Sequence, residues 1–138
     1  MMKNKALNSF NYFEKIEMRW SDIDALGHVN NAIIVTYFET ARAKFIQKWG
    51  ISKMIFILAS INVDYLKQVN YPNKITIGQN IKKIGKKSLT IEAGLFLKDS
   101  TLAAISNVVL VAFDYEKQKS IPIPKKIKDF YLKLKSQT

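Results

Sequence analysis

Cysteine is absent from this chain of 138 residues. Disulfides and thiolate metal sites are therefore excluded, which favours a reducing compartment. Long hydrophobic runs are missing as well, because the longest one, Met54–Ile61, is too short to span a bilayer. Met1–Phe10 contains no apolar stretch of signal-peptide length. We expect a cytoplasmic protein with no membrane partner, whose first ten residues are frayed.

Arginine and acidic residues are scarce. The chain has 22 lysines and arginines against 11 aspartates and glutamates, a formal net charge of +11, and only Arg19 and Arg42 are arginines. Such a charge suggests an anionic partner. Guanidinium groups bind phosphates with better geometry than ammonium groups do, so the scarcity of arginine argues against a nucleic-acid partner. A lysine-rich composition also arises from genome bias, so the charge alone defines no function.

The domain organisation is simple, because the sequence shows no repeat, no low-complexity tract and no linker. Its length fits one domain over residues 1–138. Apolar residues make up 48% of the chain, which is enough for a core. A domain of this size buries only about two-thirds of its unfolded surface. Association with a second copy would bury more, so an oligomer is plausible.

One long helix is predicted after a polar loop at Ser21–Val29. Asn30 or Asn31 is a good N-cap, and apolar residues then recur at spacings of three and four as far as Trp49. Gly50 stands where a helix would end. Further apolar residues widen this stripe, which indicates a helix surrounded on several sides.

Strands are predicted on both sides of this helix. Tyr12–Trp20 is a candidate before it, and after Gly50 the apolar period changes to two. A short C-terminal helix is expected at Ile127–Leu134, after Pro124. One early helix among many strands predicts an α+β domain, with an antiparallel sheet wrapped around a central apolar helix. The later strand candidates are residues 61–65, 75–81, 89–97 and 102–113.

Residues 19–31 hold two carboxylates, the only histidine, a glycine and two amides. Asp22, Asp24 and Gly27 resemble the opening of a calcium loop, but apolar side chains stand at its third acidic position and at its closing glutamate, so we reject this interpretation. A transition-metal site is weakly supported, since the chain has no second histidine. We therefore expect neither a metal nor a cofactor.

Two interpretations of this segment remain. Asp22 and Asp24 can simply cap a turn and a helix, with His28 as an ordinary loop histidine, and for isolated residues this structural role is the commoner one. The alternative is catalytic. A helix N-terminus offers free N–H groups that stabilise an oxyanion, and a carboxylate beside the polarised carbonyl can attack it or activate a water. Thioester hydrolysis needs both parts and no metal.

The same segment carries a family resemblance. Asp22–Asn31 reads Asp-Ile-Asp-Ala-Leu-Gly-His-Val-Asn-Asn and resembles the 4-hydroxybenzoyl-CoA thioesterase-like branch of the hot-dog superfamily. The resemblance covers roughly Phe13 to Leu132. The supporting matches, in order, are Tyr37–Arg42, Val63–Leu66, Ile84–Leu89, Phe113–Asp114 and Pro122–Pro124.

This resemblance implies a hot-dog fold, in which an antiparallel five-stranded sheet wraps around one long central helix. It implies an acyl-CoA thioesterase that forms a homodimer, and often a dimer of dimers (a homotetramer), with active sites at the subunit interface. Asp24 falls on the catalytic carboxylate and Asn31 on the amide that polarises the thioester, with His28 as a further catalytic candidate. The implied substrate-binding residues are Gly27, Val29, Asn30 and, at a turn that holds CoA phosphates, Lys86, Lys87 and Ser88.

Two segments depart from the family pattern. Ile105–Asn107 stands where relatives carry Ala-x-Gly, so Asn107 could alter the pocket or the interface. Asn70–Lys74 replaces a proline followed by Gly-Asp, which reshapes a loop at most. Glu39, on the predicted helix, either faces the pocket or pairs with Arg42 at i+3, and we favour the pair. The alternative function is a non-catalytic module that binds acyl-CoA or acyl carrier protein on the same fold.

Overall fold

The computed structural model describes residues 6–51, 53 and 55–136. Its helices and strands follow the order that the sequence predicts: an early strand, a long helix, then a run of strands and a short helix. The elements are η1 (Leu7–Ser9), β1 (Tyr12–Ile16), η2 (Trp20–Asp22), α1 (Asn31–Gln47), β2 (Phe56–Tyr65), β3 (Ile75–Ile84), β4 (Ser88–Phe96), β5 (Leu102–Asp114), β6 (Lys119–Ser120) and α2 (Lys125–Lys135).

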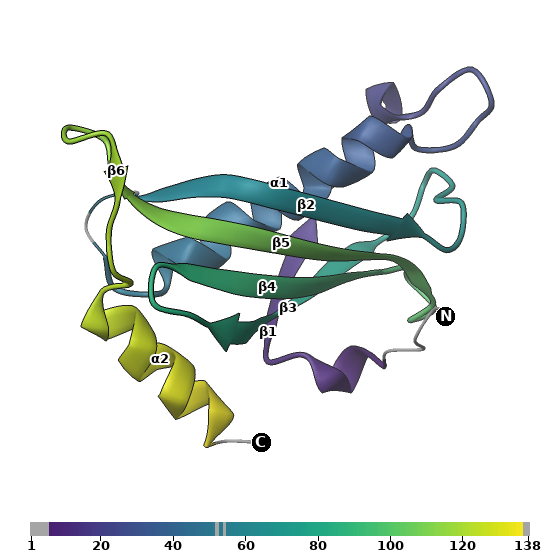
Figure 1. Ribbon diagram of the computed structural model, residues 1–138. Coiled ribbons are helices and arrows are strands. Elements are labelled where there is room, and N and C mark those ends of the chain that lie inside the picture. The colour runs from purple at the N-terminus through teal and green to yellow at the C-terminus, as the bar shows by residue number, and fades with distance from the viewer. Residues whose placement is uncertain (1–5, 52, 54, 137–138) are drawn as a thin grey trace.

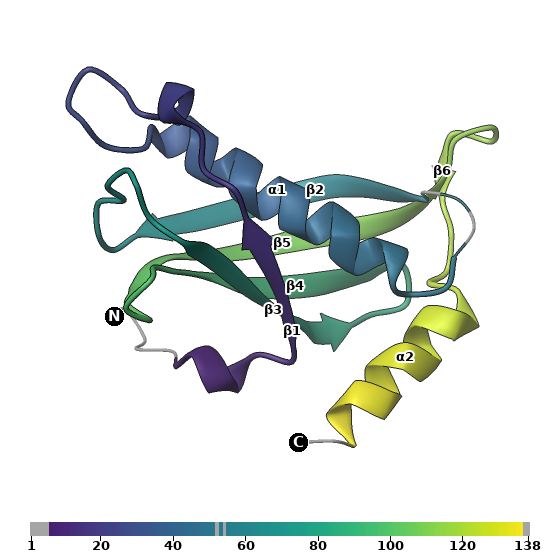
Figure 2. The same cartoon turned by 180° about the vertical axis from the view of Figure 1, so that it is seen from behind.

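The sheet has the strand order β1-β3-β4-β5-β2, and the two-residue β6 pairs with β5. Every pair is antiparallel. The sheet curls, so that β1 lies on the opposite side of α1 from β2 and β5 (Figures 1 and 2). The predicted α+β architecture, an antiparallel sheet wrapped around one long helix, is confirmed. β2 and β1 form the two edges of this sheet.

Helix α1 begins and ends where local chemistry requires it. The side-chain oxygen of Asn30, the N-cap, accepts a hydrogen bond from the Ala32 N–H at 2.8 Å. Three residues beyond the last turn, Gly50 takes a φ of +75°, a left-handed conformation that glycine adopts at little cost. The buried side chains of α1 include Phe38 and Phe45, which are 1% and 0% exposed. These side chains anchor the helix in the concave face of the sheet.

The core consists of two apolar clusters along α1. One surrounds the first half of the helix and includes Val29, Ile34 and Val69. The other surrounds its second half and joins it to α2, whose Ile127 is fully buried. Between them, the Gln79 side chain donates to the Ala41 carbonyl at 2.9 Å. The first cluster is the floor of the site described below.

The N-terminal stretch differs from the expected fraying of the first ten residues. Leu7–Ser9 form a 3-10 turn, and Phe10 is only 3% exposed. Its ring lies where glycines leave room, because a Cβ on Gly78 would stand 2.8 Å from Phe10 side-chain atoms. Residues 1–5, the rest of that prediction, lie outside the described residues.

Several element boundaries also differ. β1 ends at Ile16, four residues before the predicted end, because residues 19–22 fold into a tight turn. β2 begins at Phe56 and contains an irregularity between Leu58 and Ser60, which breaks the period-two pattern that would have predicted its first half. β6 was not predicted. No helix within the described residues is both long enough and apolar enough to cross a bilayer.

Candidate active site

A loop between β1 and α1 holds the predicted motif, and backbone hydrogen bonds fix its shape. The Asp24 N–H donates to the His28 carbonyl at 2.8 Å, and the Gly27 N–H donates to the Asp24 carbonyl at 3.0 Å. Gly27 has a φ of +84°, which favours glycine. The Val29 N–H donates to the Val69 carbonyl at 2.9 Å. This last bond ties the loop to the connection between β2 and β3.

Asp22 is the structural carboxylate of the pair, at 2% exposure. It accepts from the Arg19 N–H at 2.9 Å, from the Arg19 guanidinium at 2.9 and 3.1 Å, and from the Tyr37 hydroxyl at 2.6 Å. Burial alone would raise the pKa of Asp22, but these hydrogen bonds outweigh it and hold the pKa below its ordinary value. Burial and the same carboxylate raise the pKa of Tyr37. Asp22 therefore joins the loop to α1 and has no oxygen left for chemistry.

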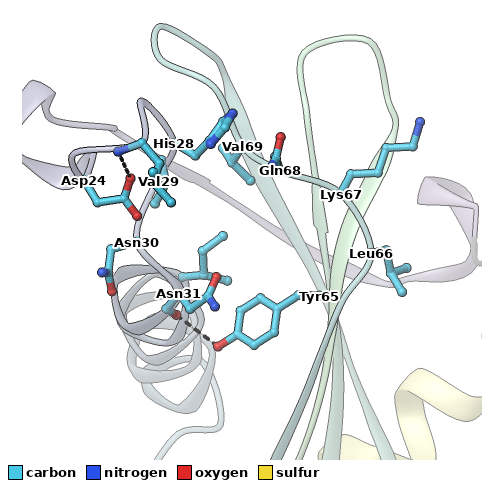
Figure 3. A pocket seen from close by; sticks show the side chains of 12 residues that line it. Asp24, His28, Val29, Asn30, Asn31, Tyr65, Leu66, Lys67, Gln68 and Val69 are labelled. Carbon is cyan, nitrogen blue, oxygen red and sulfur yellow. Dashed lines mark hydrogen bonds between the residues drawn. The ribbon is translucent and has the colours of Figure 1, made fainter.

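Asp24 is arranged differently. It is partly exposed, and only one of its carboxylate oxygens is held, by the Leu26 N–H at 2.9 Å. The other oxygen has no hydrogen-bond partner among the residues that the structure describes. Figure 3 shows the carboxylate on the side of the loop that faces the start of α1. An anchored carboxylate with one oxygen free can act on a bound molecule as a nucleophile or a base.

The first turn of α1 presents one free amide beside this carboxylate. The Ala32 N–H is capped by the Asn30 side chain, and the Ile33 and Ile34 N–H groups donate to the Asn30 carbonyl at 3.0 and 3.1 Å. The Asn31 N–H has no acceptor within the described part of the chain. It lies at the positive end of the helix dipole, so it can donate to a carbonyl oxygen that gains negative charge.

Asp24, His28 and the first residues of α1 line a cavity of about 410 Å³, a size suited to a small-molecule group. Two other cavities, of about 450 and 670 Å³, are larger. Size therefore does not select the site. We select this cavity because it combines a carboxylate with a free oxygen and a helix amide with no acceptor.

The opposite wall comes from the end of β2 and the loop that follows it, residues 65–69, which sequence reasoning did not assign to the site. The Tyr65 hydroxyl donates to the Asn31 carbonyl at 3.0 Å (Figure 3). This bond fixes the start of α1 against β2. The only sequence signal was that Tyr65 falls within one of the supporting family matches.

The remaining predicted residues of the motif occupy different positions. Val29 is 5% exposed and belongs to both the core and the cavity wall. Asn30 caps α1, so its side-chain oxygen is engaged. Figure 3 shows the His28 ring beside Val69 and Gln68, on the far side of the cavity from the start of α1. Gly27 shapes the loop and does not line the cavity.

The predicted phosphate-binding residues Lys86, Lys87 and Ser88 lie far from this cavity within one protomer. Lys86 and Lys87 occupy the turn between β3 and β4, and Ser88 is the first residue of β4. This turn lies at the end of the sheet opposite the start of α1 (Figure 1). The Lys86 carbonyl there accepts from the Ile123 N–H at 2.9 Å. One protomer therefore does not bring the two sets of predicted residues together.

Two other expectations can be compared with the structure. Glu39 and Arg42 form no ion pair within 4 Å among the described residues, which corrects the favoured prediction. Arg42 is instead 8% exposed, and burial lowers its pKa against the opposing effect of the Glu39 charge. Asn107 lies opposite Asn62 and Glu92 in the middle of the sheet, away from the cavity. No group of three or more metal-ligating side chains occurs among the described residues.

A curled antiparallel sheet around one helix, with a carboxylate at the start of that helix, defines the class of this protein as a hot-dog domain. Residues 18–131 match the model of the Thioesterase-like superfamily. The chain therefore belongs to this family, which confirms the resemblance seen in the motif.

Solved structures agree with this assignment. A thioesterase from Thermus thermophilus, described in complex with coenzyme A and Zn, is 28% identical, with a TM-score of 0.84 over 92% of this chain and 96% of that one. A predicted thioesterase from Bacillus stearothermophilus is 25% identical, with a TM-score of 0.82 over 88% and 94% of the two chains. Both relatives share the fold along nearly their whole length.

A similar sequence is the uncharacterized protein YsmA of Bacillus subtilis (strain 168), which is 32% identical over 87 residues. The match covers 60% of this chain and 59% of that protein. This chain thus aligns with less than two-thirds of the relative's length, and the relative's name states no activity.

Proposed function

We propose that this protein hydrolyses an acyl-CoA thioester to a free acid and CoA. The observation that carries the proposal is the pairing, in one cavity, of the free Asp24 oxygen with the free Asn31 N–H. The family and the CoA complex of the Thermus relative support CoA as the carrier of the acyl group.

The proposed chemistry uses two groups. The thioester carbonyl oxygen accepts a hydrogen bond from the Asn31 N–H, which stabilises the negative charge that forms on it. In one route an Asp24 oxygen attacks the carbonyl carbon, the C–S bond breaks and the thiolate leaves and takes a proton. Water then cleaves the mixed anhydride and restores the carboxylate. In the other route Asp24 takes a proton from a water whose oxygen attacks the same carbon, and the thiolate leaves with that proton.

We assign the supporting roles from the positions of the residues. Val29 and Asn30 shape the wall and the helix start beside the reacting carbonyl. Gly27 sets the loop that carries Asp24, and His28 contacts the substrate from the cavity's other side. We propose no metal and no resident cofactor for this reaction, because a carboxylate and a helix amide suffice for it.

We propose a homodimer formed through the β2 edge. β2 pairs with β5 on one side only, and it exposes three large apolar side chains, Leu58, Ile61 and Tyr65, at 42%, 41% and 43%. A long apolar edge strand is a site for association. Tyr65 belongs to both the edge and the cavity wall, so the interface would adjoin the site. A dimer of dimers would need a further surface.

An antiparallel pairing of β2 with its copy also accounts for Lys86, Lys87 and Ser88. The two-fold axis reverses the strand direction, so the partner's turn between β3 and β4 comes to the end of the assembly that holds the cavity. Lysines there can hold CoA phosphates as point charges. In this arrangement each site uses residues of both protomers.

Charges of the same sign placed on both protomers at this edge should weaken the dimer. We expect Leu58→Lys/Ile61→Lys to weaken dimerisation by about 100-fold or more, since like charges opposed across an interface cost several kcal/mol. Sedimentation equilibrium measures the change. Tyr71→Lys, at an exposed aromatic of similar exposure outside β2, is the control and should leave the dimer intact. A wild-type protein that is monomeric at micromolar concentration and fully active would refute the proposed interface.

The reaction itself is tested by thiol release from a panel of short, long and aromatic acyl-CoAs. We expect turnover of at least one of them, and the panel also defines the acyl chain. Tight binding of an acyl-CoA with no thiol release across the panel would reject the enzyme and favour the non-catalytic binding module.

A further inference from the structure

The net charge of this protein is concentrated at one end of the fold. Residues 82–87 and 114–136, which we call the basic end, contain eleven lysines and three acidic residues. The remaining described residues carry nine cationic and eight acidic side chains, so they are almost neutral. A general bias toward lysine would spread the charge along the chain. The clustering therefore points to a surface for an anionic partner.

The two segments of the basic end are in contact. The Ile123 N–H donates to the Lys86 carbonyl at 2.9 Å. A cavity of about 290 Å³ is lined by Lys82 of β3 together with Tyr131 and Leu134 of α2, and also by Glu92 of β4, whose carboxylate lies 3.8 Å from the Lys82 ammonium. Figures 1 and 2 show α2, β6 and the turn between β3 and β4 together at one end of the molecule, opposite the start of α1. The basic end is thus one continuous region.

The outer side of α2 carries an apolar residue among these lysines. Leu132 is 60% exposed, and Lys125, Lys128 and Lys135 lie seven and four residues before it and three residues after it. These spacings place the four side chains on neighbouring positions of one helix surface. An exposed apolar group surrounded by charges of one sign is suited to a protein partner with an apolar contact and an acidic rim.

Three other anionic partners, a membrane surface, a nucleic acid and CoA, account for this surface less well. A helix that lies in a membrane interface needs a free apolar face, but the apolar face of α2 is turned inward, with Ile127 at 0% exposure. Nucleic-acid readers favour arginine for phosphates, and the basic end contains none. In the proposed complex CoA phosphates would engage only the few lysines near one turn, whereas the excess charge extends along α2.

We infer that the basic end is a docking surface for an acidic carrier protein that presents an acyl group as a thioester on a pantetheine arm. The choice of a thioester carrier rests on the proposed function, but the acidic docking face does not. In the proposed dimer, the partner's basic end lies at the same end of the assembly as the cavity. From there the pantetheine arm crosses β3, β4 and β5 of the partner to reach the paired β2 strands of the two protomers. Neighbouring strands lie about 4.8 Å apart.

The test compares one acyl chain, chosen from the CoA panel, on CoA and on an acidic acyl carrier protein. Lys125→Glu/Lys133→Glu changes two exposed lysines of α2, and Lys74→Glu/Lys98→Glu makes the same charge change at exposed positions outside the basic end. We expect the α2 variant to lower kcat/KM for the acyl carrier protein by about tenfold or more, mainly through slower association. Its kcat/KM for acyl-CoA should stay within about twofold of wild type, and the control variant should match wild type with both substrates.

Binding is measured separately, by fluorescence anisotropy of a labelled carrier protein at several salt concentrations. Salt-sensitive binding that the α2 variant loses and the control variant retains supports the docking surface, even if no thioester is hydrolysed and the proposed function fails. Hydrolysis of acyl-CoA without any carrier binding, or equal losses in both variants, overturns the inference and leaves the enzyme proposal standing. Binding to phosphatidylglycerol vesicles or duplex DNA that depends on Lys125 and Lys133, without carrier binding, also overturns it.

Discussion

Asp24→Asn is expected to lower kcat for the preferred acyl-CoA by about 10²- to 10⁴-fold, the range that a positioned carboxylate contributes as a base. An amide of the same shape can keep the hydrogen bond to the Leu26 N–H, but it can neither attack the thioester nor take a proton from water. The measurement is steady-state thiol release at saturating substrate. KM should change little, because the change removes an interaction of the transition state.

The same variant should fold normally. Asp24 is partly exposed, and its one hydrogen bond is local, so we expect the melting temperature to stay within a few degrees of wild type. Asn31→Ala is a useful companion, because it removes the side chain and keeps the amide that we propose as the oxyanion donor. Near-normal turnover in Asp24→Asn would remove this residue from the mechanism.

Asp22→Ala, two residues away, should act mainly on the stability of the fold. We expect it to lower the free energy of unfolding by about 2 to 4 kcal/mol, because it leaves the Tyr37 hydroxyl and the Arg19 N–H without their acceptor. Chemical denaturation monitored by tryptophan fluorescence measures this change. Tyr37→Phe, which removes one donor and leaves the carboxylate with Arg19, should cost less. A fully stable Asp22→Ala protein would contradict the structural role.

Asp22 should also make stability depend on pH. Its pKa in the folded protein lies below its ordinary value of 3.8, so the unfolded chain binds a proton first as the pH falls. The contribution of Asp22 is fully present above about pH 4 to 5 and disappears as the pH falls through the folded pKa. The melting temperature of wild type should therefore fall more steeply with decreasing pH than that of Asp22→Asn.

The sequence predicted most elements of the fold because their signals are local. The limits of α1 could be predicted within a few residues from Asn30, the apolar stripe and Gly50. The first half of β2 was missed, since the irregularity at Leu58–Ser60 hides the alternation, and β2 is an edge strand with one paired side. β6 is only two residues long and carries no periodic signal. Phe10 was expected to fray because its contacts, Gly78 and Gly94, are distant in sequence.

The candidate site divides in the same way. Asp24 and Asn31 could be proposed together because they lie on one short loop and the helix that follows it. Tyr65 and Gln68 reach the cavity through sheet topology, which one sequence does not display. The sequence also could not separate Asp22 from Asp24 by environment. The turn at Lys86 lies at the far end of β3, so its link to the site depends on a second copy of the chain.

The central claim is that a thioester binds with its carbonyl oxygen on the Asn31 N–H and its carbonyl carbon beside the Asp24 carboxylate. A crystal structure with a ketone analogue of the preferred acyl-CoA, in which a methylene replaces the sulfur, tests it most directly. The account predicts an N···O separation of about 2.9 Å between the Asn31 nitrogen and the ketone oxygen, with the free Asp24 oxygen facing the carbonyl carbon. A ketone bound in another cavity, or turned away from the start of α1, would contradict it.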